Sequence, residues 1–245
     1  MWKEYTVAVA LCLGPVTADA ATMQTIYTGT VSGSSDMTGL FGLGANSSLD
    51  GLSFTMRTTY DTAVGLRQTM PNGSGTIDTL TGGSDYGQAD PYLSAVLTIN
   101  GISRNIGASA SSYTFALDDS GGGYSQFYQT FYDYGSYDPQ TGATQNLSYF
   151  NGIIQDVPGA IPANLDAAYS TGANSGSSGF FQFYDYDPSL GYTSLTSGSL
   201  QIASFSVSAV GIAPVPLPAG AGLLMAALGG LGLMKRRTSK RISEI

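Results

Sequence analysis

Apolar and polar residues alternate with a period of two along much of this 245-residue chain. The clearest example is the segment 52–61. One face of that segment carries Leu52, Phe54, Met56, Thr58 and Tyr60. Residues on its other face are polar, which is typical of a strand with one side buried. The pattern therefore predicts a half-buried strand here.

A hairpin is predicted directly from the residues that follow a second alternating segment. Residues 93–99 alternate, with Leu93 and Ala95 at the start of the face expected to be buried. The pair Asn100-Gly101 comes next. Because both residues tolerate a positive φ, this pair favours a two-residue turn between antiparallel strands. We expect residues 102–108 to return beside the first strand.

Further alternating segments indicate an all-β domain. Strands are predicted at residues 25–31, 113–117, 124–132, 147–154, 180–186 and 200–209. Only residues 161–169 favour a short helix, with Pro162 suited to its first turn. Many short strands joined by Gly, Asp, Ser and Asn are typical of an antiparallel β-sandwich, here jelly-roll-like.

The first twenty residues have the layout of a signal peptide. An apolar run is followed by Gly14-Pro15, and Ala18 and Ala20 place small residues where a signal peptidase recognises its substrate. We expect cleavage between Ala20 and Ala21, which makes residues 1–20 the signal peptide and 21–212 the exported domain.

The C-terminal segment, residues 213–245, predicts a single transmembrane helix. Residues 217–234 carry no charge, and as a helix they would span about 27 Å against a bilayer core of about 30 Å. A stop-transfer cluster of cations follows at once, formed by Lys235, Arg236 and Arg237. The positive-inside rule places this basic tail in the cytoplasm and the long domain outside.

A short motif stands at the start of the predicted helical segment. It consists of Val215, Pro216, Leu217, Pro218 and Ala219. In order and spacing, the motif, helix and basic cluster resemble the sorting signal of PEP-CTERM proteins of Gram-negative bacteria, in the VPLPA-CTERM variant. The resemblance implies recognition by an exosortase in the inner membrane and delivery to the cell surface or extracellular matrix. The alternative is a permanent membrane anchor with a Pro-rich stalk.

Charge and composition exclude several functions. Residues 21–214 hold three Arg, no Lys and fourteen Asp, so their formal charge is −11, which disfavours nucleic acid as a partner. The chain contains no His, and its only Cys is Cys12 in the predicted signal peptide. A Ser-His-Asp triad, a thiol nucleophile and a His/Cys zinc site are therefore excluded from the exported domain.

Carboxylates are the remaining chemical groups. Two of them can hydrolyse a glycosidic bond, and the candidate pairs are Asp118 with Asp119, Asp133 with Asp138, and Asp185 with Asp187. All lie in turn-like contexts, where Asp also serves to cap the backbone. Asp185 and Asp187 are in addition candidate calcium ligands, although the segment lacks the Gly and Glu of an EF-hand loop. No other cofactor is expected.

Tyrosine and phenylalanine are concentrated in two segments, residues 124–137 and 180–186. Such rings either fill the core or stay at the surface, where they could stack on sugars. The candidate glycan-binding residues are Tyr128, Tyr132, Tyr134, Tyr184 and Tyr186. Together these patterns predict a non-enzymatic exported surface or matrix protein. The alternatives are a carbohydrate-binding module that uses the Tyr-rich strands and a carboxylate-dependent glycosidase.

Overall fold

A computed structural model describes residues 21–119, 121–138, 143–172, 176–187 and 192–211; within these, only the backbone is described for residues 135–138, 143–146, 185–187 and 192–194. This part of the chain is almost entirely β-structure, with one 3-10 turn, η1 (Ser84–Tyr86). The strands are β1 (Thr22–Asp36), β2 (Ser53–Asp61), β3 (Leu66–Asn72), β4 (Gly75–Gly82), β5 (Tyr92–Ile99), β6 (Ile102–Asn105), β7 (Ser111–Asp119), β8 (Tyr124–Asp138), β9 (Ala143–Asp156), β10 (Tyr169–Gly172), β11 (Ser178–Asp187) and β12 (Tyr192–Ala209).

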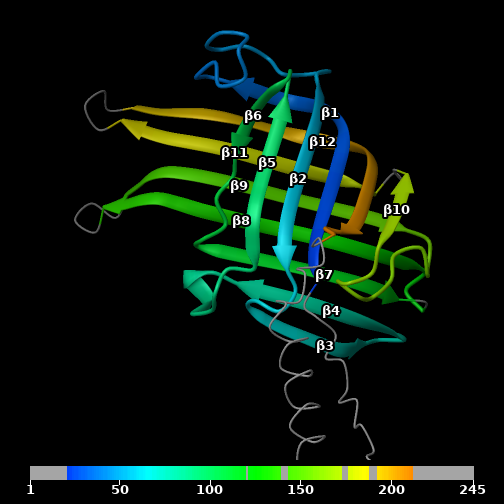
Figure 1. Cartoon of the computed structure of the whole chain (residues 1–245). Coiled ribbons are helices and arrows are strands. Elements are labelled where there is room, and N and C mark those ends of the chain that lie inside the picture. Colours follow the sequence, from blue (N-terminus) through cyan, green and yellow to red (C-terminus); the bar gives the residue numbers. More distant parts are fainter. Residues whose placement is uncertain (1–20, 120, 139–142, 173–175, 188–191, 212–245) are drawn as a thin grey trace, which may run out of the picture. The chain divides into compact units, whose positions relative to one another are not determined.

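The strands form one continuous antiparallel sheet that folds back on itself as a half-barrel. Its order is β3-β4-β7-β8-β9-β11-β12-β1-β2-β5-β6, and β10 pairs with β12 outside this path. In Figure 1, β2, β5 and β6 cross in front of β8, β9 and β11, so the two ends of the sheet make two layers. The predicted all-β, antiparallel class is confirmed. The strand order, however, runs as a single sheet rather than as the two sheets of a jelly roll.

The sheet turns from one layer into the other along β1 and β12, which are among its longest strands. Their register shifts between Thr28 and Gly29 and again between Ser32 and Ser35. Such bulges bend a strand and increase its twist. At the first shift the backbones approach so closely that a Cβ on Gly29 would lie 1.9 Å from the carbonyl oxygen of Gln201. Glycine at this position therefore allows the sheet to fold over.

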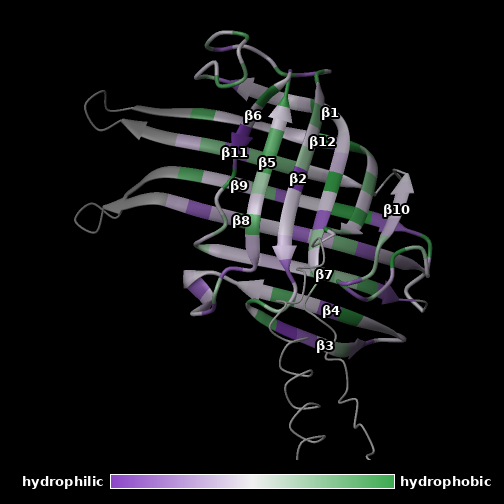
Figure 2. Ribbon diagram, viewed as in Figure 1, coloured by the Kyte–Doolittle hydropathy of each residue, from purple (hydrophilic) through white to green (hydrophobic). Residues whose placement is uncertain are grey.

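Aromatic rings from both layers meet in the core. Tyr92 on β5 lies 4.7 Å from Phe131 on β8, measured between ring centroids. Tyr27 on β1 likewise lies 5.5 Å from Phe150 on β9. All four side chains are buried, and Figure 2 shows hydrophobic positions alternating with paler or purple ones along strands of both layers. Burial of these rings holds the layers together.

A polar cluster is buried in the same core. Gln129 on β8 is fully buried, and its Oε1 accepts hydrogen bonds from Tyr27 (2.8 Å) and Thr25 (3.0 Å), both on β1. Thr25 also shares a short hydrogen bond with Thr58 on β2. The cluster links the two layers through groups that satisfy one another, so burying them does not leave the polar atoms without partners.

The structure confirms the strand and turn that the sequence predicts most clearly. β2 buries Phe54, Met56, Thr58 and Tyr60 on one face, as its alternation indicates. Asn100 and Gly101 have φ values of 52° and 75°, and Ile99 pairs with Ile102 across them. These angles are those of the expected tight turn.

Some predictions are wrong. Residues 161–169 contain no helix; instead the backbone N–H of Leu165 donates to the buried carboxylate of Asp78 over 2.9 Å. Arg67 also binds this segment, through Asp166 at 2.6 Å, so its polar groups hold it to β3 and β4 rather than in helical turns. Leu93, expected to be buried, is 62% exposed.

The predicted targeting segments lie outside the described residues, with one exception. Ala21, the expected first residue after cleavage, directly precedes β1, and its carbonyl accepts hydrogen bonds from Thr62. Ala18, Ala20, the motif at 215–219, the helix at 217–234 and the basic cluster at 235–237 are not described. Among the residues that are described, no helix has the length and apolar character needed to cross a membrane.

Candidate functional site

The outward side of the layer formed by β7, β8, β9 and β11 carries a broad group of aromatic side chains. Strand alternation separates inward residues such as Phe127 and Phe131, which are fully buried, from outward residues that solvent reaches. We define the outer aromatic face by eight outward residues: Tyr113, Phe115, Tyr128, Tyr132, Tyr134, Tyr149, Phe180 and Tyr184. Seven of these are half-buried, and Tyr134 is exposed.

Seven rings of this face form three contacting groups. Phe115 on β7 stacks on Tyr128 of β8 with ring centroids 5.2 Å apart and an interplanar angle of 22°, and Tyr113 adjoins both rings. Tyr149 on β9 lies 6.0 Å from Phe180 on β11. Tyr132 and Tyr134 make the third group, with a centroid distance of 5.1 Å.

Hydrogen bonds fix the orientation of two of these tyrosines. The Asn151 Nδ2 group on β9 donates to the Tyr128 hydroxyl over 2.8 Å. The Tyr132 hydroxyl donates to Asp85 of η1 over 2.6 Å. A ring held in this way loses less conformational freedom when a ligand binds.

Between its ends the face is uncharged. The outward side chains of β8 from Tyr124 to Tyr134, of β9 from Leu147 to Gln155 and of β11 from Ser178 to Tyr184 are aromatic, aliphatic, hydroxyl or amide groups. Burial is the main reason that the pKa of Tyr113 is raised, and the neighbouring Tyr86 and Tyr128 raise it further. Burial also raises the pKa of Tyr128. The rings of Tyr113 and Tyr128 therefore stay neutral over the whole physiological pH range.

The structure brings together most of the predicted glycan-binding residues. Tyr128, Tyr132 and Tyr134 lie on the outer aromatic face from β8, and Tyr184 lies on it from β11. The side chain of Tyr186 is not among those described. Tyr113, Phe115, Tyr149 and Phe180 were not proposed from the sequence. Their place on this face depends on the register between strands. The local signals were their alternation and, for Phe180, its position in an aromatic-rich segment.

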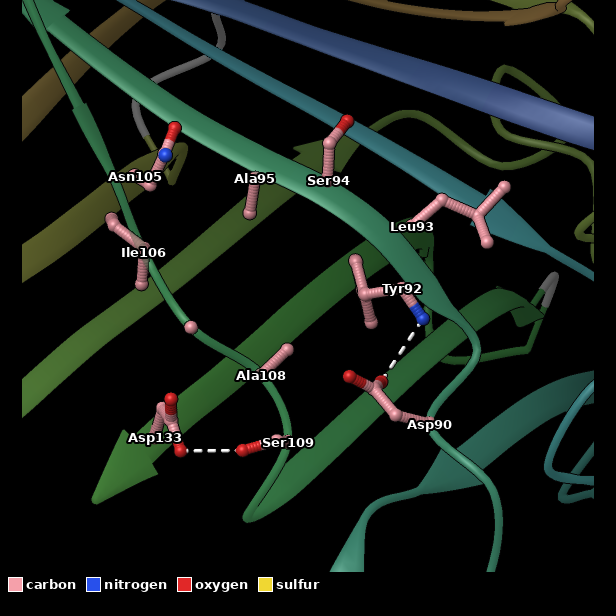
Figure 3. A pocket seen from close by; sticks show the side chains of 11 residues that line it. Asp90, Tyr92, Leu93, Ser94, Ala95, Asn105, Ile106, Ala108, Ser109 and Asp133 are labelled. Atoms are coloured by element: carbon pink, nitrogen blue, oxygen red, sulfur yellow. Dashed lines mark hydrogen bonds between the residues drawn. The ribbon is translucent and has the colours of Figure 1, made fainter. Parts of the chain in front are cut away.

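A pocket lies at a different place, at the side of the domain between β5 and the segment that follows β6. Its volume is about 310 Å³. Figure 3 shows Asp90 and Asp133 on two sides of this pocket, with Ala108 and Ser109 between them. The Asp133 carboxylate accepts a hydrogen bond from Ser109 over 2.5 Å. Gly107 packs so closely on Asp133 that a Cβ there would lie 2.3 Å from its Oδ2.

Asp90 is held by the start of β5, where its Oδ1 accepts a hydrogen bond from the Tyr92 backbone N–H over 3.0 Å. Burial raises the pKa of Asp90, and the negative charge of Asp133 contributes in the same direction. The pocket thus brings two carboxylates within electrostatic reach of each other. Sequence reasoning missed the pairing of Asp90 with Asp133 because the two residues are far apart in the sequence.

The carboxylate pairs proposed from the sequence have other surroundings. Asp118 accepts a hydrogen bond from the Gly159 backbone, and Asp119 accepts bonds from Ser74 and the Gly122 backbone. Both therefore cap turns, as their sequence context also suggested. Asp133 lines the pocket, but the side chains of Asp138, Asp185 and Asp187 are not described. Within the described residues, no group of three or more His, Cys, Asp or Glu side chains is placed to hold a metal.

Comparison with known proteins identifies no similar protein. The chain matches no protein-family model, no curated protein and no solved structure.

Proposed function

We propose that this chain is an exported, non-enzymatic protein of the cell surface or extracellular matrix, and that it attaches to extracellular polysaccharide through the outer aromatic face. One observation carries the proposal: eight accessible aromatic side chains lie on four neighbouring strands without a charged residue between them. Aromatic rings can stack on the apolar faces of sugar rings, while adjacent amides and hydroxyls bond to the sugar hydroxyls.

The export part of the proposal rests on the two ends of the sequence. A signal peptidase would cleave before Ala21, and an exosortase-type enzyme would act at the motif formed by residues 215–219. The uncharged helix at 217–234 would hold the chain in the inner membrane of a Gram-negative bacterium until sorting. No metal or other cofactor is required for this function.

The fold suits such a role. Its single folded sheet makes two antiparallel layers, as in a β-sandwich, and these layers enclose one aromatic core. The core is filled by inward residues such as Phe131 and Phe150. Because the inward residues fill the core, the outward residues of the same strands are not needed for core packing and can serve in binding.

Polysaccharide binding can be tested by co-sedimentation with exopolysaccharide isolated from the producing bacterium. The full chain should sediment with the polymer, and the double variant Tyr128→Ala/Tyr149→Ala should stay in solution. Leu43→Ala is the matched control, because it removes an exposed apolar side chain that lines neither this face nor the pocket. Failure of the unaltered chain to sediment with any native polymer would end the binding proposal.

Sorting can be tested separately by measuring the intact mass of the protein recovered from cells. We expect loss of residues 1–20 and of everything after the motif at 215–219. A mass that retains the C-terminal residues would instead show a permanent anchor, and retention of residues 1–20 would contradict export.

The pocket supports a second candidate function, a carboxylate-dependent glycosidase. Asp90, with its raised pKa, would act as general acid and Asp133 as base. The test is release of reducing sugar from the native polymer. Hydrolysis by the unaltered chain that is lost in Asp90→Asn would favour this candidate over the non-enzymatic one.

A further inference from the structure

From the charges and spacing of the outer aromatic face we infer which class of polysaccharide it takes: an uncharged polymer whose chain lies across the strands, from the rings on β7 and β8 to those on β11. The inference rests on the proposed function and adds the substrate class and its direction.

Cations are absent from the described part of the face. Residues 21–214 contain three arginines, and each is engaged or located elsewhere. Arg67 forms ion pairs with Asp78 and Asp166, both at 2.6 Å. Arg104 on β6 donates to the Leu40 carbonyl, and Arg57 lies on β2 in the other layer. A polymer bearing carboxylate or sulfate groups would find no positive charge among these strands to pair with.

Acidic side chains stand at the edges of the face. Asp85 contacts Tyr132 directly, and Asp119 stands at the end of β7. At physiological ionic strength a charge acts over about 8 Å, which covers the neighbouring strand or two. An anionic polymer laid on the face would be repelled at both places. A neutral polymer would meet no such penalty.

The rings are spaced to suit a chain that runs across the strands. Register places Tyr113, Thr130, Asn151 and Phe180 in one row on β7, β8, β9 and β11. Neighbouring strands lie about 4.8 Å apart, so the row extends over about 14 Å. It has an aromatic ring at each end and two polar side chains between them. This arrangement suits a chain of several sugar units, because each unit offers both an apolar face and hydroxyls.

Affinity electrophoresis in native gels can test the inference. The full chain, in a sugar-free non-ionic detergent, is run in gels that contain hydroxyethyl cellulose, mixed-linkage β-glucan or glucomannan as neutral polymers, and alginate or polygalacturonate as anionic ones. We expect retardation only by one or more of the neutral polymers. Raising the salt from about 50 to about 500 mM should leave it unchanged, since no ion pair is involved.

Variants locate the binding. Phe180→Ala and Tyr113→Ala, which remove the two ends of the row, should each weaken the affinity for the neutral polymer about tenfold, as expected for one stacked ring. Leu43→Ala, in the loop between β1 and β2, should bind as the unaltered chain does. Equal loss in all three variants would contradict the assignment to this face.

The remaining outcomes separate the inference from the proposed function. Salt-sensitive retardation by alginate or polygalacturonate would overturn the neutral class while leaving polysaccharide binding intact. Absence of retardation by every polymer, including the native one, would overturn both. Slow migration in gels without polymer that disappears in Phe180→Ala would show the face to be a contact between copies of the chain, and would also overturn the inference.

Discussion

Asn151 on β9 holds the ring of Tyr128 on β8 by a hydrogen bond of 2.8 Å from its side-chain amide to the phenolic oxygen. The two residues are diagonal neighbours, because Tyr128 pairs with Ile153 and Asn151 pairs with Thr130. The ring is also stacked on Phe115. Tyr128 is therefore oriented before any ligand arrives, which lowers the entropic cost of binding.

Replacing Asn151 by Leu should weaken polysaccharide binding more than it weakens the fold. Loss of one half-exposed hydrogen bond costs about 0.5–1.5 kcal/mol of stability, whereas a mobile Tyr128 ring should lower affinity several-fold. Chemical denaturation and affinity electrophoresis measure the two effects. Thr98→Val is the control, since it removes a similar surface hydrogen bond, to Ser103, from the other layer. An unchanged affinity in Asn151→Leu would show that the held ring is not needed.

Replacing Gln129, in contrast, should mainly lower the stability of the fold. Gln129→Leu removes the acceptor of the buried Tyr27 hydroxyl and leaves the Thr25 hydroxyl with only Thr58 as partner, at a cost of about 2–4 kcal/mol. Gln68→Leu on the exposed edge strand β3 should change the free energy of unfolding by less than about 0.5 kcal/mol. If urea unfolding gives similar midpoints for the two variants, the buried cluster does not stabilise the fold as argued.

The sequence predicts the parts of the fold that local residues determine, and it misses the parts that contacts with distant residues determine. β2 and the turn at Asn100-Gly101 are predicted because alternation and positive φ are local properties. β3 is missed because it is an edge strand whose residues are nearly all exposed, so Leu66–Asn72 shows no apolar alternation. The helix expected at 161–169 fails because Asp78 and Arg67, distant in sequence, bind the segment.

Some residues of the candidate site can likewise be recognised from local sequence patterns, whereas others are brought to it only by strand pairing. The tyrosines of β8 are visible in the sequence because three of them alternate within one strand. Tyr149 and Phe180 join them only through the pairing of β8 with β9 and of β9 with β11. Asp90 and Asp133 are forty-three positions apart in the numbering and meet at a pocket that no local pattern marks. Alternation along one strand does not show which residues of distant strands lie beside it.

Gly29 should be far less tolerant of substitution than Gly172. A Cβ at residue 29 would overlap the Gln201 carbonyl oxygen at 1.9 Å, whereas nothing lies within 4 Å of a Cβ at residue 172. Because the obstacle is backbone, Gly29→Ala must move β1 away from β12, and we expect a loss of about 2–4 kcal/mol. Gly172→Ala should change stability by less than about 1 kcal/mol. Thermal unfolding of both variants decides the point, and equal midpoints would contradict the close approach.

Acid should destabilise the domain partly through Asp36. Burial alone would raise the pKa of this fully buried carboxylate, but hydrogen bonds from the Phe41 and Leu40 backbones and from Thr196 outweigh it and lower the pKa. A lowered folded-state pKa gives stability that is present above the unfolded value of about 3.9 and is lost as pH falls through the folded value.

The matching variant is Asp36→Asn. It should unfold more easily than the unaltered chain at pH 7, and the difference should shrink as pH falls below about 4, where the carboxyl becomes protonated. Denaturation at a series of pH values measures this. A difference that stays constant down to pH values well below about 4 would show that Asp36 does not titrate as proposed.

NMR shift mapping of the full chain, with a neutral oligosaccharide cut from the native polymer or from β-glucan, would locate polysaccharide binding residue by residue. We expect shifts concentrated at outward residues of the four strands, such as Tyr113, Tyr128, Asn151 and Phe180, with the inward neighbours Phe127 and Gln129 less affected. Shifts centred on Asp90 and Asp133 at the pocket, or none at any sugar concentration, would refute binding by the outer aromatic face.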